Sequence, residues 1–188
     1  DSAVKSLVFG ADSEPVKSGR IATVEGSGGT GGLKIGADFL KKLNPAAKVL
    51  ISDPSWENHR ALFSSAGFIV ESYRYYDAAT RGVDFDGMLA DLNAAAPGTI
   101  ILLHACCHNP TGYDITGAQW DQVIAVVKAK NLVPFLDLAY QGFGNGITED
   151  GAVIGKFVAA GLDFFVSTSF SKSFSLYGER VGALSVLC

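Results

Sequence analysis

Lys172 stands in a setting that favours covalent chemistry. It closes the stretch Ser-Phe-Ser-Lys at 169–172, which surrounds it with small hydroxyls and an aromatic ring, and the first acid after it is Glu179. Desolvation favours the neutral amine of a lysine, which is the form that attacks carbonyl carbons. The serine hydroxyls and Arg180 match the donors that bind phosphate oxygens. A Schiff-base lysine beside a phosphate site indicates pyridoxal phosphate (PLP), and a solvated lysine on a serine-rich loop is the alternative.

A second candidate anion site is the glycine-rich stretch 26–32. Apolar residues follow it at helical spacing from Leu33 to Leu43, until Asn44 and Pro45 interrupt the pattern. A glycine loop that leads into a helix N-terminus offers free backbone N–H groups and the positive end of the helix dipole. No Gly-Lys-Ser/Thr follows it, which argues against a Walker loop, and no acid closes the next strand at a ribose-binding position, which argues against a dinucleotide fingerprint. A plain flexible turn is the alternative.

Further polar residues directly follow predicted strands. Asp137 and Tyr140 come after the apolar strand 133–136, and Asp137 suits an ion partner for a ring nitrogen, with a loop cap as the alternative. Asn109 is presented by an Asn-Pro-Thr-Gly turn after the preceding apolar strand. The histidines and cysteines of 104–108 have the wrong spacing for a tetrahedral zinc site, so we expect no metal.

Trp56 and His59 lie three residues apart after another predicted strand, 48–52. Asp53 and Pro54 are predicted as the N-cap and the first residue of the helix that carries them. Taken singly, Trp56 suits the hydrophobic core, and His59 suits a buried histidine whose nitrogens are hydrogen-bonded.

Apolar runs predict strands and helices in alternation. The predicted strands are 20–24, 48–52, 68–72, 99–103, 133–136, 164–168 and 181–186. The predicted helices are the end of one over 1–9, one over 33–43, one after Pro54, one over 84–92, one from Thr116 with a Thr116–Gln119 capping box, and one over 151–160. This order predicts an α/β fold with three layers, α/β/α, and a mostly parallel central sheet in one domain over 1–188.

The candidate residues share one position in this fold. The features that fall at or soon after the end of a predicted strand are the glycine-rich stretch, Trp56, Asn109, Asp137, Tyr140 and Lys172. The carboxyl ends of parallel strands meet at one edge of a sheet, where α/β proteins bind ligands. We therefore expect these residues to meet in one crevice although they are far apart in the chain.

The composition limits the class of protein. The 188 residues are 48% hydrophobic and 18% charged, which indicates a folded chain with a substantial core. The net charge of −4 and the scattered basic residues argue against nucleic acid or an anionic membrane as a partner. No apolar run has membrane-spanning length, the first residues do not resemble a signal peptide, and the three cysteines suit a reducing compartment, so we expect a cytoplasmic protein. Both ends look cut from a longer chain.

Several stretches together resemble the large, cofactor-binding domain of class I (fold type I) PLP-dependent aminotransferases, in the aspartate and aromatic amino acid subgroup. They are 27–31 (SGGTG), 52–59 (SDPSWENH), 104–112 (HACCHNPTG), 137–143 (DLAYQGF) and 169–182 (SFSKSFSLYGERVG). They follow the family order at family-like spacing and span nearly the whole chain. Within the subgroup, residues 173–180 are closer to the aromatic (tyrosine) aminotransferases than to strict aspartate enzymes.

The resemblance implies catalytic roles. Lys172 would hold PLP as a Schiff base and then move a proton between the substrate Cα and the cofactor. Asp137 would pair with the protonated ring nitrogen and keep the ring an electron sink. Tyr140 and Asn109 would hydrogen-bond the phenolic oxygen of the cofactor.

The resemblance also implies residues that bind the cofactor without reacting. Trp56 would stack on one face of the ring and Ala139 would pack on the other. His59 would orient Asp137, and His104 would support Asn109 from behind. The residues that would hold the phosphate are Gly29, Thr30, Ser169 and Arg180.

The implied activity is transamination of an aromatic or dicarboxylic amino acid with 2-oxoglutarate by a homodimer. Family members are much longer, and their substrate-carboxylate arginines lie beyond this chain, so we expect the piece to bind PLP weakly and to transaminate poorly or not at all. The alternatives are a lyase or decarboxylase of the same fold, a non-catalytic binding domain and a nucleotide-binding protein. The last of these leaves Asp137, Tyr140 and Lys172 unexplained.

Overall fold

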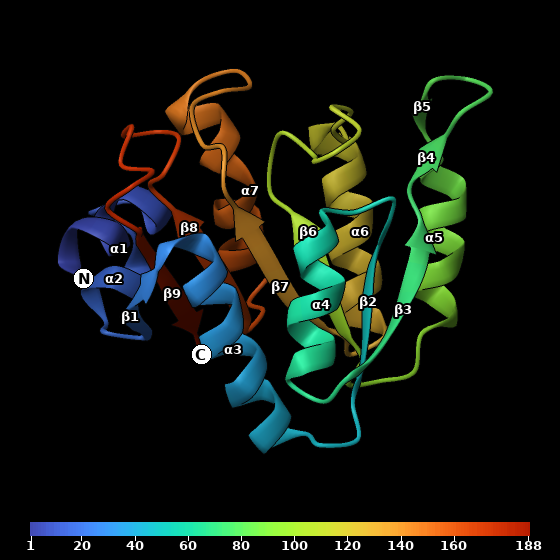
Figure 1. Cartoon of the computed structure of the whole chain (residues 1–188), viewed down its shortest axis with the longest axis horizontal. Helices are drawn as coiled ribbons and strands as arrows, with labels where there is room; N and C mark the ends of the chain where they lie inside the picture. Colours follow the sequence, from blue (N-terminus) through green and yellow to red (C-terminus); the bar gives the residue numbers. More distant parts are fainter.

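A computed structural model describes residues 1–188 as a seven-stranded sheet between two layers of helices (Figure 1). The strands of the sheet are β1 (Ile21–Ser27), β2 (Lys48–Asp53), β3 (Ile69–Arg74), β6 (Ile100–His104), β7 (Val133–Leu138), β8 (Phe164–Ser169) and β9 (Val181–Leu187). Their order is β1-β9-β8-β7-β6-β2-β3, and a separate hairpin pairs β4 (Tyr76–Asp77) with β5 (Gly82–Val83). The predicted three-layer α/β/α fold with a mostly parallel sheet is confirmed.

The helices divide between the two faces of the sheet. On one face lie α3 (Gly28–Leu43) and α4 (Glu57–Ser65), and on the other lie α5 (Phe85–Ala94), α6 (Gly117–Ala129) and α7 (Ile147–Ala159). The first helices, α1 (Ser2–Phe9) and the single turn α2 (Glu14–Lys17), lie near β1 and β9 (Figure 1). None of the helices combines the length and the apolar composition that a membrane-spanning helix requires.

Strand direction places the ends of the central strands at one edge. The pairs β2–β3, β2–β6, β6–β7 and β7–β8 are parallel, whereas β9 runs antiparallel to both β8 and β1. The carboxyl ends of β6, β7 and β8 therefore open at the same side of the sheet, close to the N-terminus of α3.

The core lies on both faces of the sheet, and β6 shows why its sequence is apolar throughout. Ile101 and Leu103 join the cluster packed under α5, α6 and α7, while Ile100 and Leu102 join the cluster under α3 and α4. Alternate side chains of a strand point to opposite faces, so a strand covered on both sides needs a continuous apolar run. This arrangement makes the central strands a rigid base for the loops that follow them.

Helix starts differ most from the sequence prediction. The prediction that Asp53 caps a helix with Pro54 as its first residue is wrong, because Asp53 still pairs with Arg74 in the sheet. The helix α4 begins at Glu57, and Trp56 is its N-cap. The capping box at Thr116 is confirmed, since its side chain accepts from the Gln119 N–H and the Gln119 side chain accepts from the Thr116 N–H.

Two other helices begin earlier than predicted. The helix α3 begins at Gly28, so most of the glycine-rich stretch forms its first turns; a Cβ on Gly32 would lie 2.7 Å from the Ala183 carbonyl, and glycine lets the helix pack against β9. The helix α7 begins at Ile147 rather than at 151. Its first turn contains Glu149 and Asp150, acids that suit a helix N-terminus but interrupt the apolar spacing on which the prediction relied.

Candidate functional site

The candidate residues line one cavity of about 170 Å³ at the carboxyl ends of β6, β7 and β8. Ten of the residues predicted for the site line this cavity: Gly29, Thr30, Trp56, Asn109, Asp137, Ala139, Tyr140, Ser169, Lys172 and Arg180. His104 also reaches the cavity, whereas His59 is fully buried behind it. The lining residues to which the sequence assigned no role are Leu33, Cys106 and Tyr177.

Asp137 supplies a buried carboxylate to the cavity wall. It lies in β7, and its Oδ2 accepts a hydrogen bond from His59 Nε2 at 2.8 Å. Its Oδ1 receives no hydrogen bond from the protein, and the side chain faces the cavity. Because a buried carboxylate is stable only when it is paired or hydrogen-bonded, Oδ1 is suited to a cationic N–H donor of a ligand.

A directed chain of hydrogen bonds runs from the Asn109 backbone to Asp137. The N–H of Asn109 donates to His104 Nδ1 at 3.1 Å, so the proton of a neutral His104 is on Nε2. That nitrogen lies 3.4 Å from Ser55 Oγ, and the Ser55 hydroxyl lies 2.9 Å from His59 Nδ1, to which it donates. His59 then donates from Nε2 to Asp137. The Asn109 amide can only donate and the Asp137 carboxylate can only accept, so the two ends of the chain place protons on His104 Nε2 and His59 Nε2, and a neutral His59 accepts the Ser55 hydroxyl at Nδ1.

The protonation state of His104 agrees with this direction of the hydrogen bonds. Burial holds the pKa of His104 well below its usual range, and the nearby His108 and His59 lower it further. Its ring stacks on that of His108 with centroids 4.1 Å apart and meets that of His59 edge-on. A neutral His104 can accept from the backbone at Nδ1, as the observed contact requires.

His108 is a supporting residue that the sequence analysis missed. It is 2% exposed, its Nε2 lies 2.9 Å from Ser52 Oγ, and its Nδ1 lies 2.8 Å from Thr111 Oγ1. Its ring stacks on Tyr75 at 3.9 Å, and burial lowers its pKa to about 4. These contacts tie the turn that presents Asn109 to the end of β2. The only signal in the sequence is its position directly before that turn.

Arg180 and the start of α3 form the other side of the cavity. The N–H of Gly28 donates to the Arg180 carbonyl at 2.8 Å, and a Cβ on Gly28 would lie 2.5 Å from Arg180 Nη2. Arg180 Nη1 donates to Ser171 Oγ at 3.2 Å and to the Tyr177 carbonyl at 3.1 Å. No carboxylate pairs with this guanidinium. An unpaired guanidinium beside a helix N-terminus is an anion site.

Lys172 is the second unpaired cation of the cavity. Its Nζ lies 4.5 Å from the centre of the Tyr140 ring and 5.8 Å from that of Tyr177, and no carboxylate pairs with it. Trp56 meets the His59 ring edge-on at 5.2 Å and is half-buried in the same wall. The amine is therefore free to react with a ligand that enters between these rings.

The donor set fits PLP. Asp137 offers a carboxylate to a protonated ring nitrogen, and Lys172 offers an amine to an aldehyde. Asn109 and Tyr140 can donate to a phenolic oxygen, while Arg180 and the helix N-terminus can bind a phosphate. The charged groups of the cavity are available to such a ligand, because Lys172 and Arg180 have no carboxylate partner and Asp137 Oδ1 accepts no hydrogen bond from the protein.

Comparison with known proteins gives consistent matches over the whole chain. Residues 2–188 match the family described as aminotransferase class I and II. The chain is 63% identical to an aspartate aminotransferase of Pseudomonas aeruginosa, over 100% of this chain and 47% of that protein. It is 56% identical to an aromatic-amino-acid aminotransferase of Escherichia coli (strain K12), over 99% of this chain and 47% of that protein.

Solved structures agree with the sequence matches. An aromatic-amino-acid aminotransferase from Burkholderia pseudomallei, covalently bound to pyridoxal phosphate, superposes with a TM-score of 0.98 at 66% identity. The match covers 100% of this chain and 47% of that one. The chain thus spans about half the length of the curated relatives it matches.

Proposed function

The chain belongs to the aminotransferase class I and II family, and we propose that residues 1–188 are the cofactor-binding large domain of a PLP-dependent aminotransferase. In this proposal the whole protein transfers the amino group of an aromatic or dicarboxylic amino acid to 2-oxoglutarate. Relatives named for aspartate and for aromatic amino acids support that substrate range. The observation that carries the proposal is the meeting of Lys172, Asp137 and Arg180 in one cavity.

The reacting residues act on different atoms. Bound PLP supplies an electron sink for the charge that develops at the substrate Cα. Asp137 would keep a proton at the ring nitrogen by accepting it in a hydrogen bond at its open oxygen. Lys172 would hold the cofactor through Nζ, and its free amine would take up and return a proton at the substrate Cα. Tyr140 and Asn109 orient the phenolic oxygen by donating hydrogen bonds to it.

Other residues position the cofactor. The indole of Trp56 covers one face of the ring, and the small side chain of Ala139 allows close approach on the other. The residues that we propose bind the phosphate are Gly29, Thr30, Ser169, Ser171 and Arg180, and the hydrogen bond from Arg180 to Ser171 supports including Ser171. The hydrogen-bond chain through His59 and His104 holds Asp137 facing the cavity.

We further propose that the whole protein is a cytoplasmic homodimer, with a substrate-carboxylate site completed outside 1–188. Large apolar side chains beside the cavity are exposed, including Phe143 and Phe174, and such groups commonly mark a contact surface. The cysteines of the chain are free thiols, as is usual in a reducing compartment.

The test is an amino-transfer assay on the whole protein. Tyrosine or aspartate is added to the PLP-loaded enzyme, the cofactor absorbance is followed, and 2-oxoglutarate is then added while the new oxo acid is measured. Transfer is expected with the parent protein and with Lys42→Ala, a control at an exposed lysine, but not with Lys172→Ala. Transfer at the parent rate by Lys172→Ala, or decarboxylation or elimination in place of transfer, contradicts the proposal.

A further inference from the structure

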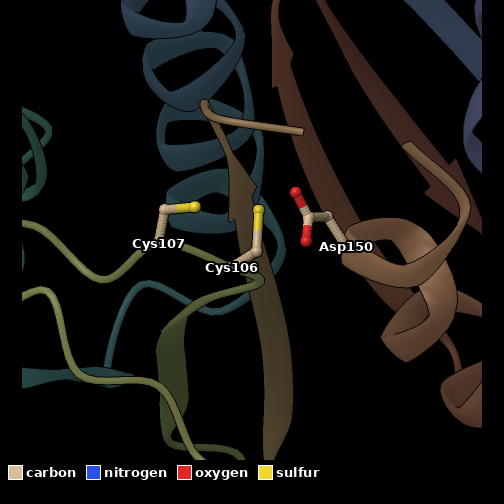
Figure 2. A group of neighbouring side chains, drawn as sticks. All are labelled: Cys106, Cys107 and Asp150. Atoms are coloured by element: carbon tan, nitrogen blue, oxygen red, sulfur yellow. The ribbon is translucent and has the colours of Figure 1, made fainter. Parts of the chain in front are cut away.

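Cys106, Cys107 and Asp150 form a cluster of potential metal ligands outside the residues given roles above (Figure 2). Both sulfurs and a carboxylate oxygen of Asp150 lie within 4.8 Å of one another. The cysteines lie in the loop after β6, with Ala105 between the strand and Cys106, whereas Asp150 belongs to the first turn of α7. The fold therefore creates this cluster from two separate elements, which the spacing of residues 104–108 alone does not reveal.

The backbone at Cys107 turns two neighbouring thiols to the same side. In an extended chain, successive side chains point in opposite directions. Cys107 instead has a φ of 50°, a left-handed conformation that is uncommon for residues other than glycine. Asp114 stabilises this turn by accepting the N–H groups of Cys107 at 2.7 Å and of His108 at 2.8 Å. The native backbone conformation at Cys107, stabilised by Asp114, thus keeps the two sulfurs close together.

The carboxylate of Asp150 is fixed before any ligand binds. It is 5% exposed and accepts the N–H groups of Gly142, Gly144 and Asn145 at 2.8 to 2.9 Å. An ionised carboxylate has about four acceptor sites, so these bonds leave it able to bind a cation. No lysine or arginine pairs with it.

The charges around the thiols favour a bound cation. Two carboxylates lie beside the thiols: Asp114 accepts the N–H of Cys107, and an oxygen of Asp150 lies within 4.8 Å of both sulfurs. No lysine or arginine pairs with either carboxylate. A bound metal ion would offset this negative charge.

We propose that Cys106, Cys107 and Asp150 bind a soft divalent cation of the zinc class, with a fourth position taken by water. Zinc accepts both thiolate and carboxylate ligands, and zinc sites with three protein ligands keep a fourth position for water. On binding, the two S–H bonds break, two sulfur–metal bonds form, and two protons pass to solvent without any change of oxidation state. The bound ion would link the loop after β6 to the start of α7. This proposal does not depend on the proposed aminotransferase function.

Cadmium is a suitable probe because its thiolate complexes absorb in the ultraviolet. The chelator-treated whole protein is titrated with cadmium chloride, followed by zinc as competitor. We expect a sulfur-to-cadmium band and release of about two protons per bound metal. Cys106→Ser and Cys107→Ser should each lower affinity by at least about 10-fold. Cys188→Ser, a matched control at an exposed cysteine, should leave the affinity unchanged.

The outcome that overturns the proposal is the absence of a thiolate band in the parent protein, or a full band in the Cys106→Ser/Cys107→Ser double variant. Circular dichroism and the thermal midpoint before metal addition report whether each variant is folded. Cadmium NMR of the parent protein gives a readout that needs no variant. A shift typical of mixed sulfur and oxygen ligands supports the site, and one typical of oxygen and nitrogen ligands alone overturns it.

Discussion

The two sides of the cofactor cavity are built differently. Behind Asp137, the supporting histidines are almost fully buried, with His59 at 0% and His108 at 2% exposure, and each has both ring nitrogens in hydrogen bonds. Around Arg180, by contrast, residues 174–180 are all exposed, and Tyr177 is 65% exposed. We infer that residues 1–188 by themselves bury the side of the cavity that faces the ring nitrogen, around Asp137, which we call the closed side. The phosphate side around Arg180, which we call the open side, is covered by other parts of the whole protein.

The largest effect is expected on the closed side, from Asp137→Asn in the whole protein. The amide cannot neutralise a protonated ring nitrogen, and breaking a buried ion pair costs about 3–5 kcal/mol. We therefore expect turnover to fall by about two to four orders of magnitude. Steady-state kinetics at saturating PLP measure it, with Asp121→Asn as the control at an exposed acid. Equal activity of the two variants would remove Asp137 from the mechanism.

A second effect on the closed side depends on pH. The pKa of His108 is about 4 in the folded chain against 6.5 for an ordinary histidine, so the unfolded chain binds the proton more tightly. The stability that His108 contributes is complete above pH 6.5 and is lost as the pH falls towards 4, by about 3 kcal/mol. Urea unfolding at several pH values measures this loss, and His108→Asn should show a correspondingly smaller one. The same loss in both proteins would assign it to other groups.

On the open side, Arg180→Lys should have a smaller effect. Lysine keeps the charge but not the planar pair of donors that suits a phosphate. We expect about 10-fold weaker PLP binding, equivalent to about 1.4 kcal/mol, with little change in folding stability. Titration of the cofactor-free whole protein with PLP measures the affinity. Arg60→Lys, remote from the cavity, is the control, and an unchanged affinity in Arg180→Lys would exclude its guanidinium from the phosphate site.

The smallest effect is expected from Phe174→Ser within residues 1–188. Phe174 is 53% exposed and meets only the edge of Phe170 among the aromatic side chains. The free energy of unfolding should change by less than about 0.5 kcal/mol, as for ordinary surface substitutions. Urea unfolding of this chain checks the value. A loss several times larger would show that the open side is already packed without further cover.

The sequence predicted the layers well because they depend on local patterns. The apolar run before His104 and the helical spacing after Thr116 both reflect burial against the sheet. The starts of α3, α4 and α7 were placed wrongly because they depend on pairing and packing that no local pattern contains. Asp53, for example, continues a strand through its pairing with Arg74.

The site residues could be predicted only where a polar or reactive side chain comes soon after the end of a predicted strand. Asp137, Asn109 and Lys172 were found in this way, and they do line one cavity, while their roles stay predictions. His108 and Asp150 were missed because their importance comes from partners distant in the chain, Ser52 for the histidine and the two cysteines for the acid. Such partnerships exist only in the folded structure.

The central claim is that Lys172 holds the cofactor. The most direct measurement is borohydride reduction of the PLP-loaded whole protein, followed by digestion and mass spectrometry of the labelled peptide. Reduction fixes the cofactor covalently to the lysine that carries it. A single phosphopyridoxyl label on Lys172 is expected, and a label on another lysine, or none, would contradict this role of Lys172.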